Sequence, residues 1–195
     1  ELEHQDKTSP SIYVNFKLTD TPKDIFPEIQ EEDAHMLIWT TTPWTLPANL
    51  AIAVHPEFQY TAVRYINPKT QRKQVSIVAD DLVESVLKLQ EIEDYERLGS
   101  VKGSFLEGLK YQHTIMKREG SVVLANYVTL TDGTGCVHTA PGHGQDDYQT
   151  GLKYKMPIVS PVDATGIFTE EAGDFAGLNI YDANKIIAEK LDELG

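Results

Sequence analysis

The fold and the chemistry of this chain centre on one run of sixteen residues, Gly133-Thr134-Gly135-Cys136-Val137-His138-Thr139-Ala140-Pro141-Gly142-His143-Gly144-Gln145-Asp146-Asp147-Tyr148. It holds too few apolar residues to be a buried core segment. Gly133 and Gly135 are typical of a tight turn or a close backbone approach. Asp146 and Asp147 are typical of a helix's first turn, where the macrodipole favours negative charge. The run is either a structural loop before an acidic helix or an active-site loop that needs a partner elsewhere.

The composition predicts one folded domain without a membrane segment. Of the 195 residues, 41% are hydrophobic, which is enough for a core. No apolar run approaches the roughly 20 residues that cross a bilayer, and no signal sequence opens the chain. Cys136 is the single cysteine, so an intrachain disulfide and a cysteine-based zinc site are excluded. We expect a cytoplasmic location, no membrane contact, and a packing role for Cys136 within a strand.

The charge balance argues against a domain that grips a nucleic-acid backbone by itself. Thirty acidic and 17 basic residues give a net charge of −13, whereas nonspecific phosphate binding needs clustered Lys and Arg. A nucleic-acid end presented by another domain is still compatible with this charge. The chain begins at Glu1 and stops at Gly195 after a helix-like run. We expect a single domain, residues 1–195, cut from a larger protein, with residues 1–10 as a linker or a strand that leads into it.

Short strands outnumber helices along the chain. Alternating or continuous apolar runs predict strands at residues 11–18, 35–40, 50–54, 59–66, 74–79, 95–102, 110–117, 121–125 and 158–162. Helices are predicted at residues 81–91, with Asp80 as its cap, and at residues 147–155 and 183–194. Residues 19–33 are acidic and contain two prolines, which is typical of a loop with solvated charges. The predicted class is α+β, β-dominant, with a twisted barrel-like sheet and peripheral helices.

A second unusual run is Trp39-Thr40-Thr41-Thr42-Pro43-Trp44-Thr45-Leu46-Pro47-Ala48-Asn49. Successive threonines direct hydroxyls to both faces of an extended segment, and the two prolines end regular strand pairing. One interpretation is a strand end whose threonines serve β-propensity and cap a turn. The other is a rigid rim of hydroxyls around a small polar ligand. Two tryptophans and an asparagine in the same run favour the ligand site.

Most familiar catalytic arrangements have no counterpart in the sequence. His138 and His143 are five residues apart, but no His-Glu-x-x-His run or cysteine cluster accompanies them, which disfavours a metal site. No phosphate-binding Gly-Lys-Ser/Thr, dinucleotide fingerprint or Gly-x-Ser-x-Gly elbow occurs. A carboxylate, two imidazoles and a threonine cluster remain, without an evident nucleophile. That set suits a site that holds a charged small molecule and positions water, without cofactor or metal.

The runs at residues 39–49 and 133–148 together strongly resemble the editing domain of isoleucyl-tRNA synthetases, the inserted connective-peptide domain of these class I enzymes. The resemblance extends to Ala51-Ile52-Ala53-Val54-His55-Pro56 and Asp6-Lys7-Thr8-Ser9-Pro10-Ser11-Ile12-Tyr13-Val14, so it covers essentially the whole chain. Valyl and leucyl enzymes carry Thr-Arg-Pro where Thr42 here precedes Pro43 and Trp44. Cys136 departs from the alanine that is frequent at its position.

This resemblance implies hydrolysis of Val-tRNA(Ile), and of Val-adenylate, with isoleucine excluded by pocket size. One methylene contributes only about 1–3 kcal/mol to discrimination, a limit for which isoleucyl enzymes are the standard illustration. The implied partners are the valine-charged 3′ end of tRNA(Ile) and the remaining domains of the parent synthetase. A positioned water would attack the ester without a covalent intermediate. Alternatives are valyl- or leucyl-type specificity, or a non-catalytic module that docks the tRNA acceptor end.

The resemblance also assigns roles to residues. Asp147 is implied as the anchor of the substrate's ammonium group, and His138 as a wall that limits side-chain size. Thr41, Thr42 and Asn49 look like contacts to the ester, the ribose or the water. The implied catalytic set is Asp147, Thr41, Thr42 and His138, and the implied substrate-binding set is Asp147, Thr40, Thr41, Thr42, Trp44, Asn49, His138, Thr139 and Ala140. Asp146 is left as a helix-capping residue and His143 as a loop-structuring residue.

Overall fold

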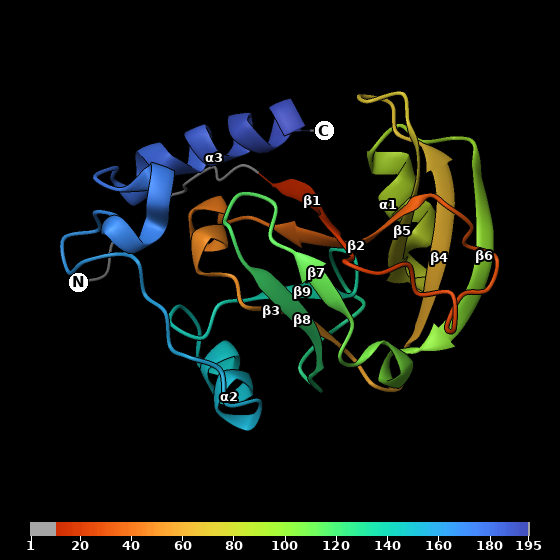
Figure 1. The fold of residues 1–195 in the computed structure, drawn as a ribbon, viewed down its shortest axis with the longest axis horizontal. Helices are drawn as coiled ribbons and strands as arrows, with labels where there is room; N and C mark the ends of the chain where they lie inside the picture. Colours follow the sequence, from red (N-terminus) through yellow and green to blue (C-terminus); the bar gives the residue numbers. More distant parts are fainter. Residues whose placement is uncertain (1–10, 195) are drawn as a thin grey trace.

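The computed structural model describes residues 11–194, and within this range nine strands form two mixed sheets (Figure 1). The predicted linker or strand over residues 1–10 lies outside the described residues. The first sheet has the order β1-β2-β5-β4-β6, with bounds Ile12–Lys17, Asp33–Thr40, Lys73–Ala79, Gln59–Ile66 and Tyr95–Lys102. The second has the order β7-β8-β3-β9, with bounds Lys110–Gln112, Glu119–Leu124, Ala51–Val54 and Cys136–Thr139. Pairs β2–β5 and β3–β8 are parallel, and the other pairs are antiparallel.

The two sheets share one apolar core. Side chains from both, such as Met36 and Ile77 in the first and Ile52 and Val122 in the second, belong to the same buried cluster. All four residues of β3 are buried, in keeping with its continuously apolar sequence between two neighbouring strands. The opposite face of the first sheet is covered by α1 (Val83–Leu89), which lies against β4 and β5 (Figure 1).

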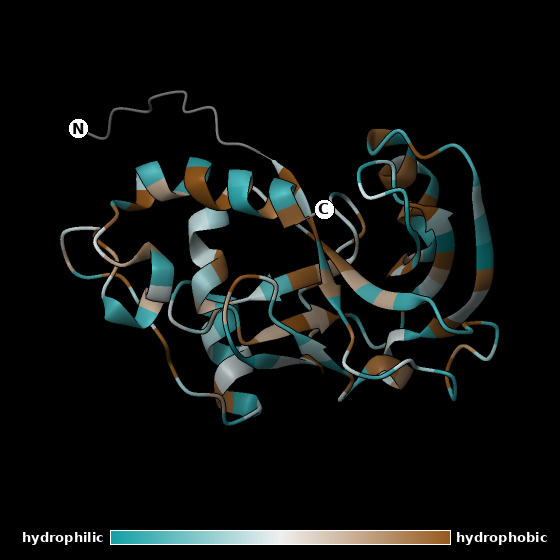
Figure 2. Cartoon of the chain, turned by 45° about the horizontal axis from the view of Figure 1, so that its top comes forward, coloured by the Kyte–Doolittle hydropathy of each residue, from teal (hydrophilic) through white to brown (hydrophobic). Residues whose placement is uncertain are grey.

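The remaining helices lie at the periphery. Helix α2 (Gln145–Lys153) follows β9, and α3 (Ile180–Leu194) crosses the molecule next to the 3₁₀ segment η1 (Pro43–Ala48). Apolar and polar residues alternate along α3 (Figure 2), and it buries Ala183 and Ile187 against the core. Three further 3₁₀ segments are η2 (Asp80–Leu82), η3 (Gly103–Leu106) and η4 (Glu170–Phe175). The predicted β-dominant α+β class is confirmed, and the strands form two open sheets that do not close into a barrel.

Three local predictions were wrong. Residues 158–162 form no strand; only a single bridge joins Val162 to Phe168, because no neighbouring strand is available to pair with this apolar run. The strand predicted at residues 110–117 stops at Gln112, where a turn begins. Asp80 does not cap α1: its carboxylate accepts hydrogen bonds from Thr61 Oγ1 and Arg97 Nη1, both at 2.5 Å.

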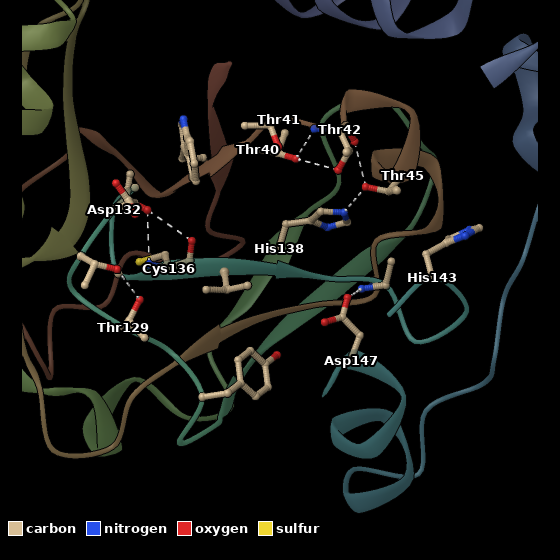
Figure 3. A pocket seen from close by; sticks show the side chains of 18 residues that line it. Thr40, Thr41, Thr42, Thr45, Thr129, Asp132, Cys136, His138, His143 and Asp147 are labelled. Carbon is tan, nitrogen blue, oxygen red and sulfur yellow. Dashed lines mark hydrogen bonds between the residues drawn. The ribbon is translucent and has the colours of Figure 1, made fainter. Parts of the chain in front are cut away.

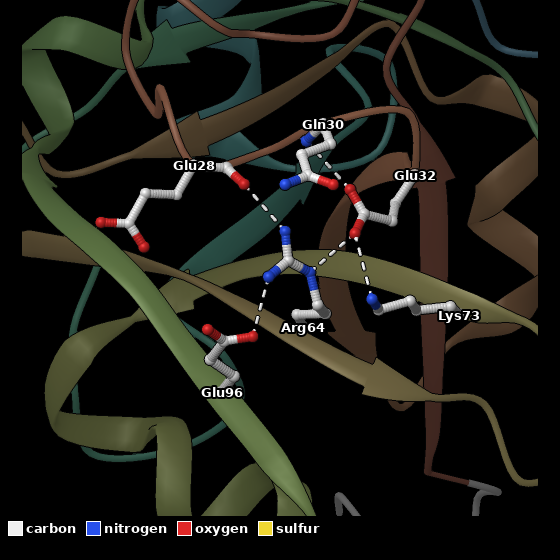
Figure 4. Close-up of polar contacts among 6 residues, drawn as sticks. All are labelled: Glu28, Gln30, Glu32, Arg64, Lys73 and Glu96. Carbon is white, nitrogen blue, oxygen red and sulfur yellow. Dashed lines mark hydrogen bonds and ion pairs between the residues drawn. The ribbon is translucent and has the colours of Figure 1, made fainter.

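The acidic loop at residues 19–33 is not wholly solvated, because Arg64 on β4 binds it (Figure 4). Arg64 Nε lies 2.7 Å from Glu32 Oε1, and its Nη2 donates to the carbonyl oxygen of Glu28 at 2.8 Å. Its Nη1 donates to Glu96 on β6 at 2.7 Å. Only 9% of the Glu32 side chain is exposed; burial opposes its ionisation, but hydrogen bonds from backbone amides and Arg64 leave its pKa below the ordinary value. This network fixes the loop to the sheet edge.

Candidate functional site

A cavity of about 420 Å³ lies where the end of β2, the start of η1, β9 and the first turn of α2 meet (Figure 3). Thr129 and Asp132 lie at one end of it, and His143 and Asp147 at the other. The two runs singled out in the sequence, almost a hundred residues apart, therefore line one site. Its lining consists of Trp39, Thr40, Thr41, Thr42, Thr45, Tyr127, Thr129, Thr131, Asp132, Gly133, Thr134, Gly135, Cys136, Val137, His138, Ala140, His143 and Asp147.

The threonine rim forms because β2 ends at Thr40 and η1 begins at Pro43. The ring of Pro43 presets its backbone for the first helical position and carries no N–H for further strand pairing. The turn between them is closed by Thr42 N, which donates to Thr40 Oγ1 at 3.0 Å. Thr41 and Thr42 are exposed at the cavity mouth, whereas Thr40 is buried. The rim thus offers two accessible hydroxyls on a constrained backbone.

Gly133 and Gly135, which open the run at residues 133–148, are both required by close approaches, as predicted. Gly133 and Gly135 have φ values of +77° and +73°, which L side chains rarely adopt. A Cβ on Gly135 would lie 2.4 Å from Ala79 Cβ, and one on Gly133 would lie 3.0 Å from the Trp39 ring. These contacts place β9 directly beside the first sheet, so His138 reaches the cavity from a firmly packed strand.

Asp147 presents a carboxylate to the cavity from the third position of α2 (Figure 3). Its Oδ2 accepts a hydrogen bond from Ala140 N at 2.8 Å, and its Oδ1 has no hydrogen-bond donor within residues 11–194. Burial raises the pKa of Asp147, the Ala140 N–H opposes the shift, and neighbouring Asp146 adds to it. The cavity therefore destabilises this negative charge, and a bound cation would relieve that cost. Asp146 itself is exposed and lies outside the lining.

His138 has both ring nitrogens engaged by protein groups. Asn49 Nδ2 lies 2.8 Å from His138 Nδ1, and Thr45 Oγ1 lies 2.9 Å from His138 Nε2. Burial, with smaller contributions from His113 and His143, lowers the pKa of His138 to about 3. The side chain is therefore neutral at pH 7. It contributes shape to the cavity and has no free nitrogen with which to take a proton from water.

The structure brings most of the predicted site residues to the cavity but not all of them. Trp44 does not line the cavity: its ring packs edge-on against His143, with the ring centroids 5.1 Å apart, and its backbone N–H donates to Asn184 Oδ1. Asn49 is 1% exposed and lies behind His138. The lining includes Thr40, Thr41, Thr42, His138, Ala140 and Asp147, and it excludes Trp44, Asn49 and Thr139.

Several lining residues were not assigned a role from the sequence. Trp39 and Thr45 belong to the threonine-rich run at residues 39–49, which was predicted to form a ligand site. Their residue types alone did not show which members of the run would face the cavity. Tyr127, Thr129, Thr131 and Asp132 precede β9 in a segment of ordinary composition, which carries no local signal. His143 also lines the cavity, and burial lowers its pKa.

The comparisons with known proteins agree with this geometry. Residues 23–192 match the family model described as "Leucyl-tRNA synthetase, editing domain". The chain belongs to the synthetase editing-domain family. It is 49% identical to isoleucine–tRNA ligases of Fervidobacterium nodosum and Petrotoga mobilis over its whole length, and it spans about a fifth of the length of these curated relatives. Within the family, the curated relatives thus place it with the isoleucyl members.

Solved editing domains share the fold. The cytosolic leucyl-tRNA synthetase editing domain of P. falciparum superposes with a TM-score of 0.74 at 11% identity, covering 94% of this chain and 97% of that one. The corresponding P. knowlesi domain gives a TM-score of 0.72 at 13% identity, covering 94% and 93%. In the described part of this editing domain, no helix is long and apolar enough to cross a membrane.

Proposed function

We propose that this editing domain hydrolyses the ester that joins valine to the 3′ end of tRNA(Ile), within a longer synthetase of which residues 1–195 form one domain. The observation that carries the proposal is the Asp147 carboxylate. It faces the cavity, is oriented by Ala140 N–H, and has a pKa raised by burial. A substrate ammonium placed there would form a charge-assisted hydrogen bond and restore the ordinary ionisation of the carboxylate.

The remaining lining suits the aminoacyl ester. His138 forms a neutral wall that limits side-chain size, and the exposed hydroxyls of Thr41 and Thr42 lie on the same cavity. These hydroxyls orient the ester and the attacking water. The water oxygen bonds to the ester carbonyl carbon, the bond to the ribose oxygen breaks, and that oxygen takes up a proton. Because both His138 nitrogens are engaged, the water is not deprotonated by this histidine.

The same carbonyl chemistry extends to Val-adenylate, which presents an ammonium and an activated carbonyl in the same relative positions. Leucyl- or valyl-type specificity is the main alternative, because the family model carries the leucyl description. The isoleucyl relatives and the run Thr42-Pro43-Trp44, in place of Thr-Arg-Pro, favour the isoleucyl type. A third possibility, a module that docks the acceptor end without catalysis, would use the polar cluster to contact RNA only, and a carboxylate in that cluster disfavours contact with phosphate groups.

Deacylation of tRNA(Ile) charged with valine, threonine or isoleucine distinguishes these possibilities. We expect the valine ester to be cleaved and the isoleucine ester to be spared. Asp147→Asn removes the anchoring charge, and it should lower kcat/KM on the valine ester about 10- to 150-fold, the range expected for a lost charge-assisted bond. Asp146→Asn is the matched control, because Asp146 lies in the same helical turn outside the cavity.

Full activity of Asp147→Asn would show that the assigned anchor is wrong. Preferential cleavage of another ester would support the alternative specificity, and binding of the acceptor end without cleavage would support the docking module. The net charge of −13 gives the chain little affinity for tRNA. A full-length isoleucine–tRNA ligase from a curated relative is therefore the positive control for the substrate preparations.

A further inference from the structure

Three side chains from the β7–β8 hairpin, two of them buried and that of Arg118 half-buried, hold the segment that runs from η1 into β3. Tyr111 Oη donates to Asn49 Oδ1 at 2.6 Å, and His113 Nε2 donates to the Leu46 carbonyl oxygen at 2.8 Å. Arg118 Nε donates to the Asn49 carbonyl oxygen at 3.1 Å. These three side chains are absent from the cavity lining. They act on the site only through the residues that they hold.

The Asn49 amide has one favourable orientation. Two partners select it together: Nδ2 lies 2.9 Å from the Ala51 carbonyl oxygen, which can only accept, and Oδ1 lies on the side of Tyr111. Its Oδ1 then faces the Tyr111 hydroxyl, which has no other acceptor within the described chain. The same Nδ2 also points to His138 Nδ1 at 2.8 Å. That ring nitrogen must therefore carry a lone pair and no proton.

The tautomer of His138 follows from this arrangement. With Nδ1 accepting, the neutral ring carries its proton on Nε2 and donates it to Thr45 Oγ1 at 2.9 Å. The Thr45 hydroxyl in turn donates to the Thr42 carbonyl oxygen at 2.9 Å. One directed chain of hydrogen bonds thus runs from Tyr111, outside the cavity, to the threonine rim.

Tyr111 is itself held so tightly that its hydroxyl cannot move to another partner. The ring is fully buried, and a Cβ on Gly120 would lie 2.2 Å from Tyr111 Cζ, so the ring packs directly on that backbone. Phe16 contacts it edge-on with a centroid distance of 5.1 Å. A phenylalanine would fill this space as well. Packing alone therefore does not account for the hydroxyl, whereas the bond to Asn49 does.

We propose that Tyr111 is a positioning residue, whose hydroxyl holds Asn49 and through it keeps His138 in a single tautomer and orientation as a rigid cavity wall. The tautomer follows from the geometry alone, and the consequence for selectivity rests on the proposed function. A wall that excludes a substrate differing by one methylene must be rigid, because such a group contributes discrimination of only about 10- to 200-fold. Loosening the ring enlarges the space open to a side chain without removing any group that touches the ester.

The test is Tyr111→Phe, with Tyr65→Phe as the matched control. Tyr65 is also buried, and its hydroxyl bonds Ser76 and Gln74 in the first sheet, so the control loses a comparable contact away from the site. In ¹⁵N spectra of the histidine rings, the unmodified chain should show His138 with the proton on Nε2 only. Tyr111→Phe should show signals averaged between the two tautomers, and Tyr65→Phe should leave them unchanged.

Selectivity gives the second readout. Tyr111→Phe should lower the ratio of kcat/KM for the valine ester to kcat/KM for the isoleucine ester about tenfold. The change should come mainly from a higher kcat/KM for the isoleucine ester, with little change in kcat for the valine ester. A single unchanged Nε2 tautomer in Tyr111→Phe would overturn the proposal. A chain that hydrolyses no valine ester would refute the proposed function but leave the tautomer result standing. If Tyr111→Phe does not fold, Asn49→Asp replaces the donor with a carboxylate and should move the proton to Nδ1; a retained Nε2 proton would also overturn the proposal.

Discussion

Acidification should destabilise this domain through two histidines, the buried His113 and the half-buried His138, that each use a ring nitrogen as an acceptor. His113 Nδ1 accepts from Ile115 N and Met116 N at 3.1 and 3.2 Å, and His138 Nδ1 accepts from Asn49 Nδ2. Protonation of Nδ1 would place an N–H opposite the N–H groups that now donate to it, so these hydrogen bonds would be lost. Burial lowers the pKa of His113 to about 4 and that of His138 to about 3, from an ordinary 6.5.

The magnitude follows from proton linkage. Both folded-state pKa values lie below the unfolded value, so the unfolded chain takes up protons first and stability falls as the pH drops below about 6.5. Between pH 7 and pH 4.5 each histidine should remove roughly 2–2.5 kcal/mol from the free energy of unfolding, with a slope near 1.36 kcal/mol per pH unit. Together they should remove about 4–5 kcal/mol, which is comparable to the whole stability of many domains.

Urea denaturation at several pH values, followed by the fluorescence of Trp39 and Trp44, measures this loss. His113→Gln should lower the free energy of unfolding at pH 7. It should also reduce the dependence of that free energy on pH between pH 5.5 and 4.5 by the contribution of one proton, about 1.36 kcal/mol per pH unit. Tyr65→Phe removes a buried hydroxyl and should shift the whole curve without altering that slope. Asp147 contributes with the opposite sign, because its raised pKa favours protonation of the folded state. A slope in His113→Gln equal to that of the unmodified chain would refute the assignment.

Three further predictions concern packing and reactivity. Gly135→Ala should cost about 2–4 kcal/mol in thermal unfolding, because its Cβ would lie 2.4 Å from Ala79 Cβ; Gly108→Ala, with positive φ and open space, isolates the backbone strain. Arg64→Met should cost about 1–3 kcal/mol in urea denaturation, because Glu32, whose side chain is 9% exposed, loses its nearest cation and the Glu28 carbonyl oxygen loses a donor; a change below 0.5 kcal/mol would contradict this. The Cys136 thiol is 2% exposed and burial raises its pKa, so Ellman's reagent should label it only after unfolding.

The sequence predicted the strands whose apolar pattern alone indicates that they are buried. Residues 51–54 are continuously apolar and form a strand between two neighbours, as expected. The apolar run at residues 158–162 has similar local propensity, but the fold supplies it with no pairing strand. Strand formation there depends on tertiary context, which a single sequence does not contain. The same limit explains why two separate sheets were not distinguished from one twisted sheet.

The part of the site formed by the two unusual runs, residues 39–49 and 133–148, was predictable from the sequence. The part formed by residues without a local motif was not, because only the fold brings them together. The family resemblance implied a substrate contact for Asn49, yet this residue directly follows η1 and is buried behind His138. Tyr111, sixty-two residues away, shows no motif at all, and only the fold brings its hydroxyl to Asn49.

The charges that line the cavity connect its architecture to its proposed substrate. Two carboxylates, Asp132 and Asp147, line it, and no Lys or Arg does so among the described residues. His138 and His143 have lowered pKa values and add no positive charge at pH 7. The local potential is therefore negative and favours an ammonium over a phosphate group. A 3′ end that carries an aminoacyl group brings an ammonium, and an uncharged 3′ end does not, so this lining should retain the substrate and release the hydrolysed tRNA.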